Sequence, residues 1–180
     1  PDGTPHAGNP KKPGWAPEVW SIGHRNVQAA AIHPDTGQLW TIEHGARGGD
    51  EVNRPEAGKN YGWPVITYGR DYSGVPIGVG ARKDGLEQPV YYWDPSIAPS
   101  GATFYSGRLA PDWKGNLFVG ALAGSHVARL VLKGNEIVAE EKLLTDRGDR
   151  FRAVTEGPDG ALYLLTDDPK GEVLRVEPRG

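Results

Sequence analysis

One short unit recurs three times in the sequence and limits the fold more than any other feature. Each copy begins with Pro-Asp, passes through a turn glycine and continues as leucine, an aromatic residue and further apolar residues. The copies start at Pro34, Pro111 and Pro158. Pro, Asp and Gly favour tight turns, and the apolar and aromatic residues after them favour a strand. Each copy is therefore predicted to be a turn that leads into a β-strand.

Each copy also belongs to a longer series of strand candidates. An extended run precedes every copy, at 28–32, 102–105 and 152–155, and further runs follow the last two copies at 127–132, 136–144 and 172–176. The leucines Leu117 and Leu162 are about 45 residues apart, which matches the roughly 40–50 residues of a β-propeller blade. Leu39 and Leu117 are about 78 residues apart, so the first unit must contain an insertion.

The pattern predicts an all-β fold of about half a β-propeller, with roughly three blades of four-stranded antiparallel meanders. We expect a loop or arm at 1–17, a blade with an inserted loop at 18–99, a second blade at 100–146 and the start of a further blade at 147–180. Unpaired sheet edges favour association, so we expect more chain or a partner to complete the ring. A plain β-sandwich with similar turns is the alternative that the pattern leaves open.

Composition and charge exclude several function classes. The formal net charge is −3 and the pI is about 6.0, so the basic surface that nucleic acid requires is not expected. No apolar stretch is long enough to predict a membrane span. The sequence has no cysteine, which excludes disulfides and zinc thiolates, and no methionine, which leads us to expect a processed chain or a piece of a longer one.

Three glycine-rich segments carry the candidate functional residues: 23–26, 43–53 and 58–64. Arg25 with Asn26 precedes the first strand of one repeat, and Arg150 with Arg152 lies at the first strand of another. Equivalent strand ends of a propeller converge on its central channel. Because a guanidinium binds a carboxylate through two parallel hydrogen bonds, these arginines predict an anionic ligand with several carboxylates.

The second of these segments is rich in oxygen ligands. Glu43, Asp50, Glu51, Asn53 and the carbonyls of the 45–49 loop would suit Ca²⁺, which takes six to eight hard oxygen ligands. The spacing is not that of an EF-hand, and a solvated acidic turn is the alternative reading.

The histidines and serines give no recognisable catalytic pattern. The five histidines, at positions 6, 24, 33, 44 and 126, show no zinc-ligand spacing. His24 and His44 could act as general bases or could position the neighbouring loop. The serines occupy no nucleophile elbow, and the glycines form no Walker or Rossmann motif, which disfavours hydrolase and nucleotide-binding functions.

As an ordered set, these motifs resemble a known family. The set comprises Gly-His-Arg-Asn at 23–26, Glu-His-Gly-Ala-Arg-Gly-Gly-Asp-Glu-Val-Asn at 43–53, Gly-Lys-Asn-Tyr-Gly-Trp-Pro at 58–64, Ile-Ala-Pro-Ser-Gly at 97–101, Arg-Phe-Arg at 150–152 and Gly-Pro-Asp-Gly-Ala-Leu-Tyr at 157–163. From about Gly14 onward, the chain is similar to the glucose/sorbosone dehydrogenase family of soluble PQQ-dependent aldose sugar dehydrogenases.

The resemblance implies a six-bladed β-propeller of which this chain is the C-terminal half, with PQQ and Ca²⁺ at the mouth of the channel. It implies PQQ contacts from four residues and a weaker contribution from one tryptophan: Arg25, Asn26, Arg150, Arg152 and Trp93. It implies one Ca²⁺ on backbone carbonyls and a second, structural Ca²⁺, with ligands divided between Gly45 and Ala46 for the first and Asp50, Glu51 and Tyr61 for the second.

The activity that the resemblance implies is oxidation of an aldose to its lactone by hydride transfer to PQQ, with the electrons passing to an external acceptor. The family's catalytic histidine belongs to the N-terminal half, so no catalytic residue is expected in this chain, which should be inactive alone. The remaining half of the propeller and the aldose are the expected partners, and a homodimer is left open. A periplasmic or secreted location is expected.

Two positions depart from the family pattern. Ala123 stands where members commonly have a lysine or another basic residue that contacts the cofactor, and Ala153 stands where an aspartate usually follows the second arginine of Arg-Phe-Arg. These departures motivate an alternative hypothesis, a noncatalytic propeller that binds carbohydrate or a protein partner and has lost its cofactor.

Overall fold

The computed structural model describes residues 2–177, which form eleven β-strands and one short 3₁₀ helix. The strands of the first sheet are β1 (Val27–Ile32), β2 (Leu39–Glu43), β3 (Asp50–Asn53) and β4 (Tyr91–Trp93). Those of the second sheet are β5 (Pro99–Phe104), β6 (Leu117–Ala121), β7 (His126–Lys133) and β8 (Glu136–Leu143). The third sheet has β9 (Phe151–Glu156), β10 (Leu162–Thr166) and β11 (Val173–Val176).

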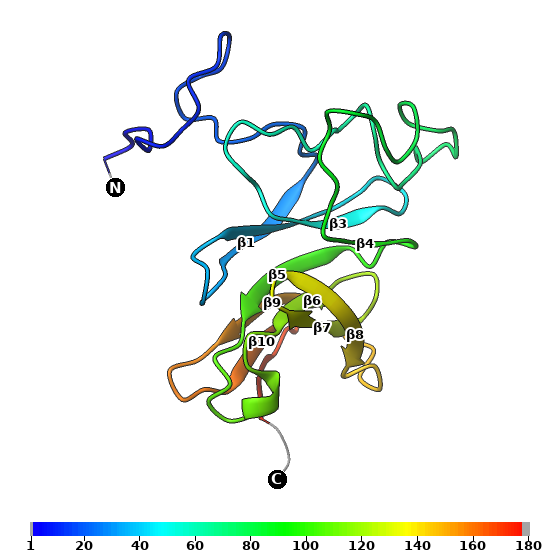
Figure 1. Cartoon of the computed structure of the whole chain (residues 1–180). Helices are drawn as coiled ribbons and strands as arrows, with labels where there is room; N and C mark the ends of the chain where they lie inside the picture. Colours follow the sequence, from blue (N-terminus) through cyan, green and yellow to red (C-terminus); the bar gives the residue numbers. More distant parts are fainter. Residues whose placement is uncertain (1, 178–180) are drawn as a thin grey trace.

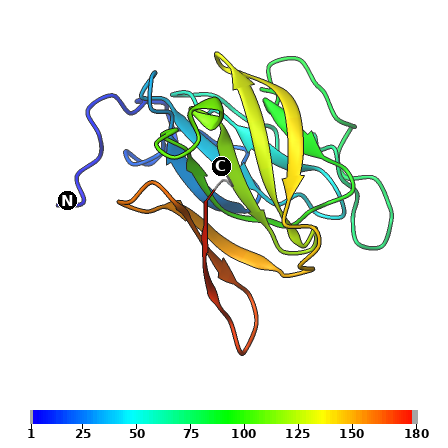
Figure 2. The ribbon, with the colours of Figure 1, turned by 90° about the horizontal axis from the view of Figure 1, so that it is seen from below.

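Each sheet is an antiparallel meander in which every strand pairs with the next one in the chain. Figure 1 shows the sheets as successive layers, and Figure 2, seen from below, shows β10 and β11 as a hairpin that projects to one side. The predicted all-β class and four-stranded antiparallel meanders are confirmed, and the layers follow one another as blades of a β-propeller do. The third sheet contains three strands, and the 3₁₀ helix η1 (Pro111–Trp113) precedes β6.

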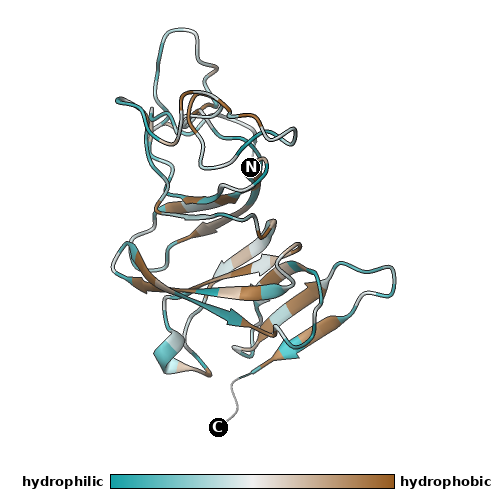
Figure 3. Cartoon of the chain, turned by 90° about the vertical axis from the view of Figure 1, so that its right-hand side faces the viewer, coloured by the Kyte–Doolittle hydropathy of each residue, from teal (hydrophilic) through white to brown (hydrophobic). Residues whose placement is uncertain are grey.

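The second sheet is buried on both faces because its strand β6 alternates between two cores. Leu117 and Val119 pack with Trp40 and Ile42 of the first sheet. Phe118, which lies between them in the sequence, packs instead against residues of the third sheet such as Phe151 and Leu164. This is the period of two that a strand imposes, and apolar and polar residues alternate in the same way along many strands in Figure 3.

The first strands of the sheets lie side by side, with β5 between β1 and β9. The backbones of β5 and β9 approach so closely that there is no room for a side chain at Gly101. A Cβ added at Gly101 would lie 2.8 Å from the Cα of Ala153 and 3.0 Å from the amide nitrogen of Val154. The glycine is therefore required by the packing of one sheet on the next.

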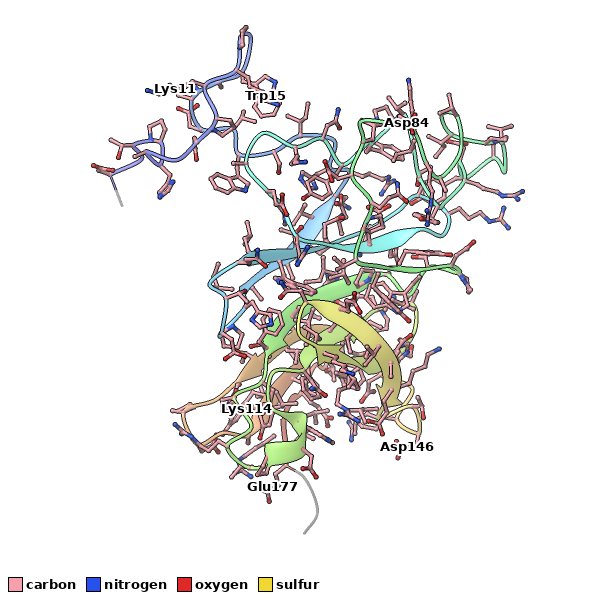
Figure 4. All side chains as sticks on the ribbon, viewed as in Figure 1. Lys11, Trp15, Asp84, Lys114, Asp146 and Glu177 are labelled. Carbon is pink, nitrogen blue, oxygen red and sulfur yellow. The ribbon has the colours of Figure 1, made fainter. Side chains whose placement is uncertain are left out.

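Two segments lie outside the sheets. Residues 2–17 contain no strand or helix and extend away from the layers as an arm, on which Figure 4 labels Lys11 and Trp15. The connection from 54 to 90, labelled at Asp84, joins β3 to β4 and covers the first sheet on the side away from the second. Within residues 2–177, no helix is long and apolar enough to cross a membrane.

We predict that Gly101→Ala in the full-length protein lowers the free energy of unfolding by about 1–3 kcal/mol, because the added methyl group overlaps backbone that cannot turn aside. Urea unfolding followed by tryptophan fluorescence measures the change. As a control, Ala139→Val adds methyl groups at an exposed position of β8 and should change the free energy by less than about 0.5 kcal/mol. Equal effects of the two substitutions would contradict the close approach of β5 and β9.

Candidate functional site

The buried carboxylate of Glu43, at the end of β2, holds the Gly-His-Arg-Asn segment in place. Its side chain is almost fully buried and accepts hydrogen bonds from the amide of Arg25 at 2.6 Å and the side-chain amide of Asn53 at 2.8 Å. His24 Nδ1 contacts the same carboxylate at 3.0 Å, while its Nε2 lies 2.8 Å from Ser21 Oγ. A buried charge requires such partners, so Glu43 and this segment fix each other.

The same segment packs directly on the Gly-Lys-Asn-Tyr-Gly-Trp-Pro motif. The Gly23 carbonyl accepts a hydrogen bond from the amide of Trp63 at 2.9 Å, and Gly23 has a φ of 78°. A Cβ at Gly23 would lie 2.2 Å from Asn60 Oδ1, so both the conformation and the space require glycine. The structure thus brings together the three glycine-rich segments that the sequence singles out.

Arg25 is half-buried and has no carboxylate partner among residues 2–177. Its guanidinium lies 5.2 Å from the centre of the Trp63 ring, and its Nη1 donates to the His44 carbonyl at 3.3 Å. The stacking fixes the direction of the side chain without neutralising its charge. Asn26 is exposed beside it, where its side-chain oxygen accepts a hydrogen bond from Gln28 at 2.8 Å.

The 45–49 loop is curled so tightly that a Cβ at Gly45 would lie 2.1 Å from the Gly48 carbonyl oxygen. Asp50, which is fully buried, holds this loop: its Oδ1 accepts the amide of Gly45 at 2.9 Å. The carbonyls of Gly45 and Ala46 accept no hydrogen bond from any residue that the structure describes, and both residues line a cavity of about 660 Å³. Backbone oxygens in this state are suitable ligands for a hard cation.

The second carboxylate oxygen of Asp50 binds the segment that precedes the second sheet. Its Oδ2 accepts Ser96 Oγ at 2.6 Å and the amides of Ile97 and Ala98 at 2.8 and 3.0 Å. With three hydrogen bonds on Oδ2 and one on Oδ1, most of the acceptor capacity of the carboxylate is used. The structure therefore gives Asp50 a positioning role, and its predicted Ca²⁺ contact remains a prediction.

Glu51 differs from Asp50 because its carboxylate lacks such donors. Its Oε2 accepts one hydrogen bond, from Asn53 Nδ2 at 3.1 Å, and burial raises the pKa of Glu51 to about 7. Asn53 itself is fully buried, and its Oδ1 has no partner among the described residues. A cation beside these two oxygens would relieve both the desolvated carboxylate and the unpaired amide oxygen.

Tyr61 lies beside this group but its hydroxyl is occupied. The hydroxyl donates to the Arg54 carbonyl and accepts the amide of Glu56 at 3.1 Å, and burial raises the pKa of Tyr61. Its ring stacks on His24 with 4.8 Å between centres. No three side chains of His, Asp or Glu within residues 2–177 are placed to hold a metal by themselves, so a Ca²⁺ here would depend on carbonyl and amide oxygens.

Arg150 and Arg152 lie at the start of β9 and share one acidic partner. Arg150 Nη2 lies 2.8 Å and Arg152 Nη2 lies 3.1 Å from the carboxylate of Asp167, and both arginines lower the pKa of Asp167. The side chains of the two arginines are about half exposed. The sequence analysis missed Asp167, although two arginines on one face of a strand favour a carboxylate on the neighbouring strand.

Two side-chain hydrogen bonds bring the beginnings of β1, β5 and β9 to the same end of the layers. His44, whose amide binds the Asn26 carbonyl at 3.0 Å, contacts the Pro99 carbonyl through Nε2 at 2.6 Å. Ser100 Oγ then donates to the Phe151 carbonyl at 2.6 Å. The segments that carry Arg25 and Arg150 are therefore linked through β5.

Trp93 adjoins the 45–49 loop through its backbone: it pairs with Asp50, and its carbonyl accepts the amide of Gly49 at 2.8 Å. It is 5 % exposed, belongs to the core between the first and second sheets, and donates through Nε1 to Glu140 of β8 at 3.1 Å. Its side chain is occupied in this core, and its predicted contact with PQQ remains a prediction. Ala123 is exposed and Ala153 lies against Gly101.

The chain is similar to known proteins over nearly its whole length. The family described as Glucose / Sorbosone dehydrogenase matches residues 1–175. The chain is 48 % identical to the aldose sugar dehydrogenase YliI of Escherichia coli over 171 residues, which cover 94 % of this chain and 46 % of that protein. It is 26 % identical over 221 aligned positions to quinoprotein glucose dehydrogenase B of Acinetobacter calcoaceticus, covering 92 % of this chain and 46 % of that protein.

Two solved structures show the same arrangement of strands. The apo form of the soluble aldose sugar dehydrogenase of Escherichia coli aligns with a TM-score of 0.92 and 47 % identity, over 97 % of this chain and 51 % of that one. The PQQ-bound aldose sugar dehydrogenase of Streptomyces coelicolor aligns with a TM-score of 0.72 and 32 % identity, over 97 % and 48 %. The chain spans about half the length of the relatives it matches, and it belongs to the glucose/sorbosone dehydrogenase family.

Proposed function

We propose that this chain is the C-terminal part of a PQQ- and Ca²⁺-dependent dehydrogenase that oxidises aldoses to lactones. One observation carries the proposal: Arg25, a half-buried cation without a carboxylate partner, donates to the His44 carbonyl directly before the carbonyls of Gly45 and Ala46, which accept no hydrogen bond from residues 2–177. A ligand that combines carboxylates with a hard cation satisfies both groups at once. The relatives named as aldose sugar dehydrogenase and the PQQ-bound structure support this ligand.

Each group of the candidate site has its own task in this proposal. Arg25 and Asn26 would bind PQQ oxygens, and Arg150 with Arg152 would bind a further carboxylate after releasing Asp167. The carbonyls of Gly45 and Ala46 would hold one Ca²⁺. Glu51 and the unpaired Oδ1 of Asn53 would hold a second, structural Ca²⁺ beside Tyr61.

The chemistry needs a base that this chain does not provide. PQQ, when bound, supplies the two-electron acceptor for the hydrogen of the anomeric carbon, and the anomeric hydroxyl gives its proton to a base. Both nitrogens of His24 are engaged, by Ser21 and Glu43, and Nε2 of His44 contacts the Pro99 carbonyl. We therefore propose that these two histidines position the loops and that the part of the protein outside these 180 residues supplies the base.

Reconstitution of the full-length protein that carries this chain tests the function. With PQQ and Ca²⁺ added, we expect reduction of an external dye that depends on glucose, and we expect residues 1–180 alone to show none. Removal of Ca²⁺ with EGTA should weaken PQQ binding, because the arginines lose the help of the cation and the two bare carbonyl oxygens repel an anion. If the full-length protein neither reduces dye nor keeps PQQ absorbance after desalting, the enzyme is excluded and the noncatalytic propeller is favoured.

We also predict that Glu43→Gln in the full-length protein weakens PQQ binding by about tenfold, because the substitution removes the charge that holds the Arg25 amide and His24. It should also lower the free energy of unfolding by about 1–3 kcal/mol. Fluorescence titration with PQQ and urea unfolding measure the two effects. Glu136→Gln, an exposed carboxylate of β8, serves as the matched control and should change neither. Unchanged PQQ affinity in Glu43→Gln would show that Glu43 serves stability alone.

A further inference from the structure

The cavity beside the 45–49 loop contains charges that the proposed cofactor site does not use. It has a volume of about 660 Å³, and Gly45 and Ala46 are among the residues that line it. Arg47 and Arg70 line it together with Asp94 and Tyr72. A reactant that approaches the proposed Ca²⁺ carbonyls through this cavity therefore meets two guanidinium groups and one carboxylate.

The two arginines are held directly opposite each other. The amide of Arg47 donates to the carbonyl of Arg70 at 2.9 Å, and the amide of Arg70 donates to the carbonyl of Arg47 at 3.0 Å. This reciprocal exchange is the hydrogen-bonded pair of an antiparallel ladder, in which both side chains leave the same face with Cα atoms about 5.5 Å apart. Like charges in this arrangement destabilise each other, and an anion bound between them would relieve the repulsion.

Neither arginine has a carboxylate partner among residues 2–177. Asp94 lines the same cavity but forms no ion pair with them, and its Oδ1 packs against Gly48, where an added Cβ would lie 2.3 Å away. Arg129, Arg150 and Arg152, by contrast, all pair with carboxylates. The cavity thus keeps a local excess of positive charge in a chain whose formal net charge is −3.

We propose, building on the function proposed above, that this cavity selects aldoses that carry an anionic group. Arg47 and Arg70 would bind a carboxylate or a phosphate at the end of the sugar remote from the anomeric carbon. Asp94 would accept a hydrogen bond from a sugar hydroxyl, and Tyr72, which is 70 % exposed at the cavity, would offer its ring face to the pyranose. Ala46, Arg47 and Arg70 line the same cavity, which would let one sugar contact the arginines through its anion and the proposed cation through its anomeric end.

Turnover by the reconstituted full-length protein tests the proposal with three sugars: glucose, glucuronate, and glucose 6-phosphate. We expect kcat/KM to be about tenfold higher for an anionic sugar than for glucose, and we expect Arg70→Gln to remove this preference. Arg70→Lys keeps the charge but not the two-pronged geometry, so it should restore oxidation of the phosphate better than that of the carboxylate. Arg82→Gln, an exposed arginine outside the cavity, is the matched control.

Calorimetric titration of PQQ-free full-length protein with glucuronate and with glucose 6-phosphate tests the same residues without turnover. We expect binding that weakens about tenfold in Arg70→Gln, stays unchanged in Arg82→Gln and weakens as salt is raised. Equal binding of glucose and both anions, or equal effects of the two substitutions, would overturn the proposal.

The anion site and the dehydrogenase function can fail separately. If Arg70-dependent binding occurs but no aldose is oxidised, the anion site stands and the dehydrogenase function fails. Unchanged PQQ affinity in Arg70→Gln would show that the anion bound by Arg70 belongs to the sugar. A tenfold loss of PQQ affinity would show that it belongs to the cofactor and would overturn the substrate assignment.

Discussion

The close approach of the first strands β1, β5 and β9 is the constraint on which the rest of the structure depends. Gly101 allows the backbones of β5 and β9 to touch, and Ser100 and His44 then reach the carbonyls of the next sheet. These are buried or half-buried side chains whose bonds are costly to leave unmade. Because the contacts lie at the strand beginnings, they place the segments that carry Arg25 and Arg150 at one end of the layers.

Two buried carboxylates hold the loops of the candidate site on this scaffold. Glu43 and Asp50 both accept hydrogen bonds from backbone amides. Glu43 binds the amide of Arg25, and Asp50 binds the amides of Gly45, Ile97 and Ala98. A carboxylate in a buried place is stable only with such donors. The carbonyls of Gly45 and Ala46 accept no hydrogen bond from residues 2–177, and both residues line a cavity, so a proposed cation site here depends on the backbone more than on acidic side chains.

Local patterns in the sequence were sufficient to predict most strands, whereas β3 and β4 and the partners of individual charges were not predicted. The Pro-Asp units gave strands β2, β6 and β10, because turn chemistry and apolar runs act over a few residues. The sequence does not distinguish Asp50 from Glu51, since only the fold brings Ser96 and Ile97 to one of them. Trp93 and Asp167 illustrate the same limit, because burial against Glu140 and pairing with Arg150 are contacts between distant segments.

The arginines of this chain differ in what a bound anion would gain from each. Asp167 neutralises Arg150 and Arg152 in exposed pairs, which contribute little, so a ligand with several carboxylates can displace it. Arg25 is half-buried over Trp63, where the loss of water makes an anionic partner more valuable. Arg47 and Arg70 are exposed, so water screens their repulsion across one ladder, and an anion relieves a small cost as well as forming bonds. The strength of anion binding in this chain therefore depends less on how many arginines it has than on how each one is paired and solvated.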